Sequence, residues 1–352
     1  MRLEFWLPRY CCYGAALLAP QLNPAEAASL PVDPVPTTAG IVVNPQAAYG
    51  GFLGNGFLGR ALGIDETSGV RLGGFLIPEF DWVASGGVKP DSSFGGIALG
   101  LNASVDMAKA LEIPGGTLGV ELLVSNGGAN NDAAGSVQQY TNFDATEPRD
   151  RQQMTQLWWR QRLFDDRLFL QMGKMNGAAI FNTVLNPVIV NDPHLQDSSI
   201  SNLIYVPVGL NPTLFGRLSA YPDTAYGVVV HLAPTTNMYA SYGIFDGNLL
   251  FGDTGRDWWP EVNDYKFHIG ELGYSWRLGK VGMPGRIGLG GWRQTGDLYT
   301  PALTVEDGAT GYYLFANQRL WYLHPSLNNA GLIGYLQYGH TGSDASIVNT
   351  YL

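Results

Sequence analysis

Hydrophobic and polar residues alternate along most of the chain after position 69. In the stretch "GVRLGGFLIPEFDWVASGG", the apolar residues Leu76, Phe80 and Trp82 share one parity, whereas Glu79 and Asp81 share the other. Alternation with a period of two predicts a β-strand that has one apolar face and one polar face. The apolar face must then either pack into a protein core or contact lipid.

The same alternation recurs in segments of about ten residues, which turn sequences separate. Five pairs of segments predict hairpins, with turns at 114–116, 165–166, 234–236, 284–285 and 325–330. With the opening strand and one irregular strand near 214–220, we count about twelve strands, and a thirteenth begins near Ser346. The long connections are expected at 127–149, 176–212, 247–263 and 296–309. Tight turns at one end and long loops at the other are typical of outer-membrane barrels.

Composition indicates what the apolar faces contact. Charged residues make up 14% of the chain, whereas soluble domains have about 25%. So few charges do not suffice to coat the outside of a soluble barrel, whose interior would be apolar. We therefore expect an all-β fold, a transmembrane antiparallel β-barrel with apolar residues toward lipid and polar residues toward water. A soluble β-propeller or β-sandwich is the alternative fold.

Three further features of composition agree with this interpretation. The chain contains 46 glycines and 12% aromatic residues, and glycine disfavours helices. Its net charge of −10 argues against a nucleic-acid partner, because phosphate backbones favour Lys and Arg. No window of the sequence is long and apolar enough for a membrane-spanning helix.

The N-terminal region differs from the rest of the chain. Arg2, an apolar run and the small-residue pattern Ala25-Glu26-Ala27 predict a signal peptide over residues 1–27. Residues 28–68 are expected to form an arm and an apolar segment that tucks inward, and residues 69–352 the barrel. Cys11 and Cys12 are the two cysteines of the chain, so the mature protein is expected to contain none.

Eight motifs occur in one order along the chain: "FLIPEFDWVASGG", "ASVDMAKALEIPGG", "LWWRQRLFDDRLFLQMGK", "YGIFDGN", "IGELGYSW", "GMPGRIGLGGWRQTG", "GYYLFANQRLWY" and "GLIGYLQYGHTG". In this order they resemble the carbohydrate-selective porin family of the OprB type. The resemblance implies a sixteen-stranded barrel and passive uptake of small sugars through the outer membrane of a Gram-negative cell. By motif position it also implies that Glu79, Arg160 and Glu271 line the pore.

The C-terminal end departs from this pattern. The chain stops at "SIVNTYL", where the resemblance implies further hairpins. Each backbone group left unpaired in lipid costs several kcal/mol, and single-chain bacterial barrels close with an even strand number. We therefore expect the barrel of residues 69–352 to be C-terminally incomplete.

A sugar pore needs groups that bind hydroxyls, aromatic faces for the sugar rings, and binding weak enough to allow release. Nine residues with inward parity are candidates for pore lining or sugar binding: Arg71, Glu79, Asp81, Trp158, Arg160, Arg162, His231, Glu271 and Trp292. Such mixed charge suits hydroxyls better than ions. Each charge has an alternative role in wall ion pairs, and the two tryptophans have one in an interfacial belt.

Two local features have competing interpretations. His231 has no second His or Cys at ligand spacing, so it is expected to be a wall residue rather than a metal ligand. The connection 176–212 is too long and too apolar for a solvated loop. We expect it to fold into the lumen and narrow it; the alternative is packing between the subunits of a homo-oligomer.

The resulting prediction is an outer-membrane porin that passes mono- or small oligosaccharides, without a cofactor or metal. The alternatives are a non-selective general diffusion porin and a secreted soluble all-β carbohydrate-binding protein. Enzyme motifs are absent from the sequence. Glu79 and Asp81 would lie on one side of any substrate, whereas a glycosidase needs carboxylates that flank the bond. We therefore expect no enzymatic activity.

Overall fold

The computed structural model describes residues 57–128, 130–135, 150–182, 211–220, 222–247, 265–323 and 331–352. The chain divides into two units, Met1–Ala39 and Gly40–Leu352, and the described residues all belong to the second. The predicted signal peptide and most of the predicted arm therefore lie outside the described residues.

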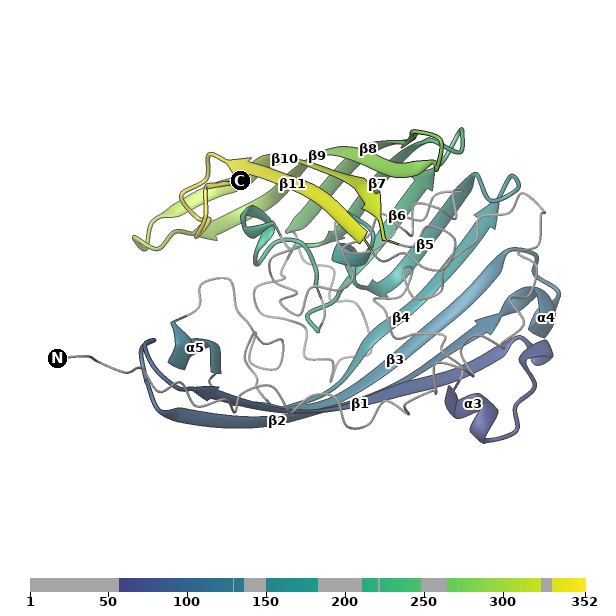
Figure 1. Ribbon diagram of the computed structural model, residues 1–352, viewed down its shortest axis with the longest axis horizontal. Coiled ribbons are helices and arrows are strands. Elements are labelled where there is room, and N and C mark those ends of the chain that lie inside the picture. The colour runs from purple at the N-terminus through teal and green to yellow at the C-terminus, as the bar shows by residue number, and fades with distance from the viewer. Residues whose placement is uncertain are drawn as a thin grey trace. The chain divides into compact units, whose positions relative to one another are not determined.

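The second unit is built on one antiparallel sheet of twelve strands, in which each strand pairs with its neighbours in the chain (Figure 1). The strands are β1 Val70–Val83, β2 Ser92–Asp106, β3 Gly116–Asn126, β4 Arg151–Leu163, β5 Leu168–Met175, β6 Ala225–Leu232, β7 Met238–Asp246, β8 Lys266–Leu278, β9 Met283–Tyr299, β10 Val305–Tyr322, β11 Gly331–Thr341 and β12 Thr350–Tyr351. The predicted all-β class and the five predicted strand pairs are confirmed. The turn expected at 284–285 is wrong, because Pro284 and Gly285 belong to β9 and the β8–β9 turn lies at 279–282. The turn expected at 325–330 lies outside the described residues.

The remaining elements are short. They are the α-helices α3 Phe57–Ala61, α4 Met107–Leu111 and α5 Asn130–Ala134, and the 3₁₀ turns η1 Glu66–Ser68, η2 Gly177–Ala179 and η5 Pro212–Leu214. Within the described ranges, no helix has the length and apolar character needed to cross a membrane.

Two predicted elements differ in the structure. The irregular strand expected near 214–220 is wrong, because η5 begins there with Pro212 in its first turn and the Asn211 side chain capping it. The strand that completes the count of twelve is instead β12 at the end of the chain. The long connection expected at 296–309 is also wrong, since β9 runs to Tyr299 and β10 begins at Val305.

The two faces of the sheet differ as the alternation predicts. Segments 176–182 and 211–224, which connect β5 to β6, pack against one face, and we call this the inner face. On the opposite, outer face, Leu76, Phe80 and Trp82 of β1 are exposed. In β8, Glu271 is 2% exposed on the inner face and Leu272 is 63% exposed on the outer face. The predicted facing of both strands is therefore confirmed.

Aromatic rings lie against glycines on the inner face. The pairs that join neighbouring strands are Phe75 with Gly100, Trp158 with Gly119, Tyr239 with Gly273, Tyr313 with Gly290, Phe315 with Gly288, and Trp292 with Gly311. At each of these glycines an added Cβ would overlap the ring. At these six positions glycine is therefore needed because the ring occupies the space of a side chain.

The sheet order begins with β1 and ends with β12. Among the described residues these two strands do not pair with each other, so the sheet is not closed. Helix α3 packs beside β1, where an added Cβ on Gly59 would lie 3.3 Å from the backbone nitrogen of Leu72. That residues 28–68 tuck inside a barrel stays a prediction.

Candidate functional site

Glu271 is the centre of a row of polar and aromatic side chains that crosses the inner face from β4 to β10. The hydroxyl of Tyr239 on β7 donates to Glu271 Oε1 at 2.6 Å, and the hydroxyl of Tyr313 on β10 donates to Oε2 at 2.6 Å. The backbone N–H of Asn182 donates to Oε2 at 2.7 Å. Three donors therefore converge on one buried carboxyl group, which links two strands to the segment that follows β5.

His231 on β6 continues the row toward β5. Its ring stacks on Phe169 with centroids 4.7 Å apart and on Tyr239 with centroids 5.4 Å apart. Its Nδ1 lies 2.7 Å from Ser241 Oγ. These contacts are those of a wall residue. Among the described residues no group of three potential metal ligands occurs.

Arg160 on β4 occupies the other end of the row. Its Nε and Nη2 donate to Gln171 Oε1 at 2.9 and 2.6 Å. Its guanidinium lies over the rings of Trp158 and Phe169 at 5.3 and 5.0 Å. The side chain is thus held by an amide and by two π-faces, which favour a cation over them.

The connection between β5 and β6 is attached to the inner face at several strands. Asn182 contacts β8 through Glu271, and Asn211 Nδ2 donates to the carbonyl of Tyr338 on β11 at 3.2 Å. The two described ends of this connection therefore pack on the face of the sheet that carries Glu271. Residues 183–210 lie outside the described residues, so narrowing of a lumen stays a prediction.

Arg217 fixes the part of this connection that follows η5. Its guanidinium donates to Gln294 Oε1 and to Ser346 Oγ, each at 3.0 Å, and lies 5.3 Å from the ring centre of Trp292. Burial lowers the pKa of this guanidinium, and the carboxylate of Glu306 opposes that shift.

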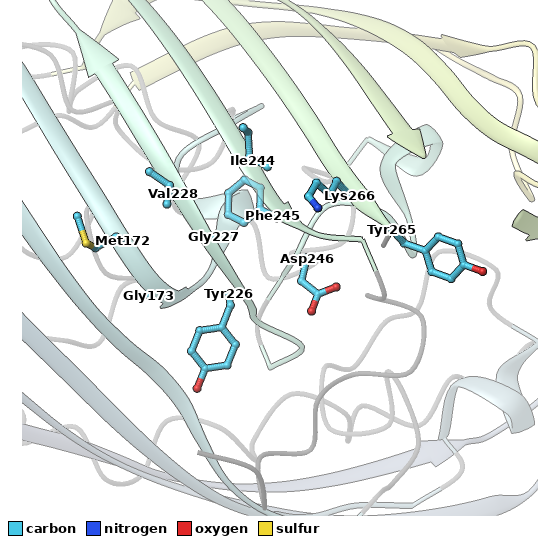
Figure 2. A pocket seen from close by; sticks show the side chains of 10 residues that line it. All are labelled: Met172, Gly173, Tyr226, Gly227, Val228, Ile244, Phe245, Asp246, Tyr265 and Lys266. Atoms are coloured by element: carbon cyan, nitrogen blue, oxygen red, sulfur yellow. The ribbon is translucent and has the colours of Figure 1, made fainter. Parts of the chain in front are cut away.

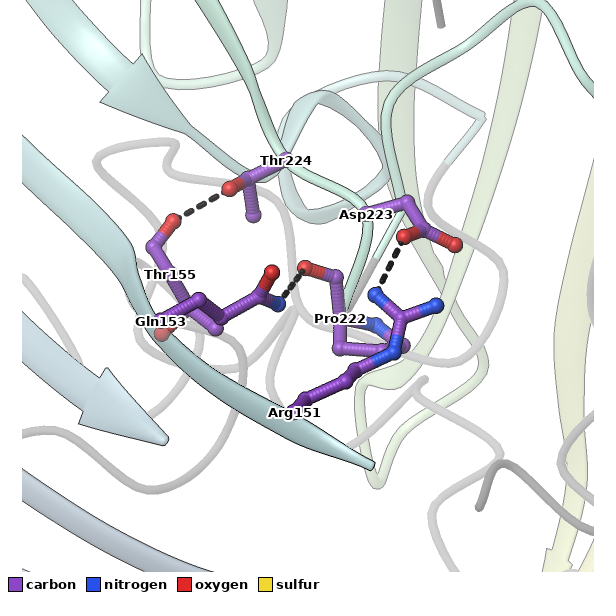
Figure 3. Close-up of polar contacts among 6 residues, drawn as sticks. All are labelled: Arg151, Gln153, Thr155, Pro222, Asp223 and Thr224. Carbon is purple, nitrogen blue, oxygen red and sulfur yellow. Dashed lines mark hydrogen bonds and ion pairs between the residues drawn. The ribbon is translucent and has the colours of Figure 1, made fainter. Parts of the chain in front are cut away.

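The end of the same connection is fixed to β4 (Figure 3). Arg151 Nη1 forms an ion pair with Asp223 Oδ1 at 2.6 Å, and Gln153 Nε2 donates to the carbonyl of Pro222 at 3.0 Å. The hydroxyl of Thr224 donates to the carbonyl of Thr155. The described parts of the connection are therefore attached to β4, β8, β9 and β11.

The inner face of β1 is different. Arg71 is exposed, and Glu79 and Asp81 are half-buried. Asp81 accepts a hydrogen bond from Asn130 Nδ2 of α5. These three predicted residues are on the predicted face, but they are separate from the row around Glu271 and remain open to solvent.

All nine predicted site residues lie on the inner face. The structure brings Trp158, Arg160, His231 and Glu271 into one row. Arg162 lies at the β4–β5 turn, where its Nε is 3.7 Å from Asp166 Oδ1. Trp158 and Trp292 are 1% and 4% exposed, so both rings are covered. Their role as stacking platforms stays a prediction.

Sequence reasoning missed the partners of Glu271. Tyr239 shares the parity of Ser241, and Tyr313 that of Phe315, so both could have been assigned to the inner face. Their contact with Glu271 joins residues 32 and 42 positions apart. Arg217 was missed because it follows a turn, where alternation carries no signal.

Comparisons with solved structures support this fold. The high-pH structure of Pseudomonas putida OprB matches with a TM-score of 0.67 and 17% sequence identity, covering 83% of this chain and 71% of that chain. The low-pH structure of the same protein matches with a TM-score of 0.46 and 13% identity, covering 82% of this chain and 72% of that chain. The first match shows a shared fold.

The sequence comparisons identify the family. No curated protein matches the sequence. The family model described as "Carbohydrate-selective porin, OprB family" matches residues 98–352, which include every strand from β3 to β12. With its alternating antiparallel strands and its polar inner face, the chain belongs to the OprB family of carbohydrate-selective porins, through which sugars diffuse passively across the outer membrane.

Proposed function

We propose that small sugars pass along the inner face of this sheet and contact mainly the open polar groups of β1. The observation that carries this proposal is the difference in exposure between two parts of the inner face. Arg71, Glu79 and Asp81 are open or half-open, whereas Glu271 and Arg160 are almost fully buried. Only groups in contact with water can exchange that water for a sugar hydroxyl.

The buried row has a different role in this proposal. Glu271 already accepts three hydrogen bonds, and Arg160 is held by Gln171. Satisfied groups gain little from a ligand. The row instead holds the connection between β5 and β6 in place, and this connection shapes the passage. Trp158, Arg162, His231 and Trp292 belong to the supporting wall.

The open groups match the chemistry of a neutral sugar. Each hydroxyl of a sugar both donates and accepts, and Arg71 supplies donors while Glu79 and Asp81 supply acceptors. The binding must stay weak for conduction, and solvent-exposed side chains provide weak binding. The chain thus acts as a passive pore without a catalytic step, in the outer membrane after export by its predicted signal peptide; a homo-oligomer is compatible with this role.

Planar-bilayer conductance of a full-length version with a closed barrel, titrated with mono- and disaccharides, tests the proposal. We expect sugars to lower the ionic current in a saturable way. Asp81→Asn replaces a charged acceptor by a neutral one, which costs about 1 kcal/mol and so weakens the sugar block about fivefold.

Asp165→Asn is the matched control, because Asp165 is exposed in the β4–β5 turn and its positive φ suits Asn equally well. It should leave the block unchanged. An ionic current that no sugar reduces would instead identify a general diffusion porin. A chain that stays in solution without detergent would identify a soluble carbohydrate-binding protein.

A further inference from the structure

A groove with a cavity volume of about 530 Å³ lies on the outer face, across β5, β6, β7 and the start of β8 (Figure 2). Met172, Val228 and Ile244 form its apolar part. Met172 pairs in register with Val228, and Val228 pairs with Ile244. All three side chains are exposed. They therefore form a continuous apolar row on the face that a porin turns toward the membrane.

The groove ends in polar side chains. Tyr226 lies near the start of β6, Asp246 is the last residue of β7, and Lys266 is the first residue of β8, with Tyr265 just before it. Tyrosines concentrate where the hydrocarbon meets the headgroups. The groove thus runs from the level of the headgroups into the apolar band, which is the arrangement of a lipid molecule itself.

Lys266 supplies an unused positive charge at the polar end. Among the described residues its ammonium has no hydrogen-bond or ion-pair partner. Its register partner Asp246 has an interaction partner of its own within the chain. An ammonium at the level of the headgroups attracts phosphate, with which it forms charge-assisted hydrogen bonds.

We propose that this groove binds one phosphate-bearing membrane lipid, with an acyl chain along Met172, Val228 and Ile244 and the phosphate at Lys266. The polar end of the groove lies at the strand ends of β6, β7 and β8 at which the long connections 176–224 and 247–264 begin or end in the sequence, and in bacterial barrels the long loops are extracellular. The lipid therefore belongs to the outer leaflet. The inference rests on the outward orientation of this face and is independent of which sugar the pore passes.

Native mass spectrometry of the full chain in detergent micelles tests the proposal. The probe is phosphatidic acid, and diacylglycerol with the same acyl chains is the control without phosphate. We expect one phosphatidic acid to be retained per chain, and much less diacylglycerol. Lys266→Gln removes the charge-assisted contact and should reduce the retained phosphatidic acid about tenfold.

A second pair of variants tests the apolar part. Val228→Trp fills the groove and should abolish retention, whereas Leu272→Trp, on the outer face away from the groove, should leave it unchanged. Heat-modifiable gel migration establishes that each variant is folded.

Three outcomes would overturn the proposal. The first is equal retention of phosphatidic acid by the wild type and by Val228→Trp. The second is equal retention of phosphatidic acid and diacylglycerol. The third is a dimer that Val228→Trp abolishes, because the occupant of the groove would then be a second copy of this chain.

Discussion

Glu271 and Leu272 are consecutive residues of β8, yet they depend on different physical interactions. Glu271 is buried on the inner face and holds three donors from three separate parts of the chain. Leu272 is exposed on the outer face, where the membrane is the expected neighbour. The position of Glu271 therefore requires a particular side chain, whereas the position of Leu272 requires only apolar character.

Two consecutive glycines of β9 show the same difference between the inner and the outer face. Gly290 on the inner face lies under the ring of Tyr313, so any side chain there would overlap the ring. Its neighbour Gly291 is on the outer face, where the nearest atom to an added Cβ would be the Gly311 carbonyl oxygen at 3.7 Å. Shape is thus constrained at Gly290 and free at Gly291.

The largest expected effect comes from breaking the apolar character of the outer face. Leu272→Arg should lower the free energy of unfolding from lipid bilayers by about 2–4 kcal/mol, the cost of a charge at the bilayer midplane on a lipid-facing position. Leu272→Phe keeps the position apolar and should be nearly neutral. Denaturant titration in lipid vesicles measures both variants. If arginine were tolerated as well as phenylalanine, the outer face would not contact lipid.

A smaller effect is expected from changing shape on the inner face. Gly290→Ala forces Tyr313 away from its position and should cost about 1–3 kcal/mol, the usual range for overpacking. Gly291→Ala makes the same chemical change one residue later and should change stability by less than about 0.5 kcal/mol. Unfolding titrations of the two variants give the comparison directly, and equal losses would contradict the difference between the faces.

The smallest effect is expected from removing one donor to Glu271. Tyr313→Phe keeps the ring over Gly290 but removes the hydroxyl, and it should cost about 1 kcal/mol because two donors remain. Tyr312→Phe alters the adjacent tyrosine, which is exposed on the outer face, and should cost less. Unfolding titrations again provide the measurement. A greater loss for Tyr312→Phe would show that Glu271 does not depend on its tyrosine donors.

Local pattern was sufficient for much of the fold. The strand pairs and the facing of Phe80, Leu272 and Glu271 followed from alternation, because side chains on a strand alternate between faces whatever the rest of the chain does. The motifs from β3 onward indicated the family because each of them occupies a short stretch of the sequence and can be recognised without the tertiary structure. The irregular strand near 214–220 was wrong because Asn211 and Pro212 start a 3₁₀ turn, a signal that parity does not contain.

Sequence alone therefore determined that the chain is a sheet with one polar and one apolar face, and that nine candidate residues lie on the polar one. Only the tertiary structure decided which of them remain open. Burial of Glu271 depends on contacts with residues up to 89 positions away, and a local pattern contains no information about such distant partners. Asp81 has the same parity signal as Glu271 but stays half-open, whereas the described parts of the connection that follows β5 contact β4, β8 and β11 and help to bury Glu271.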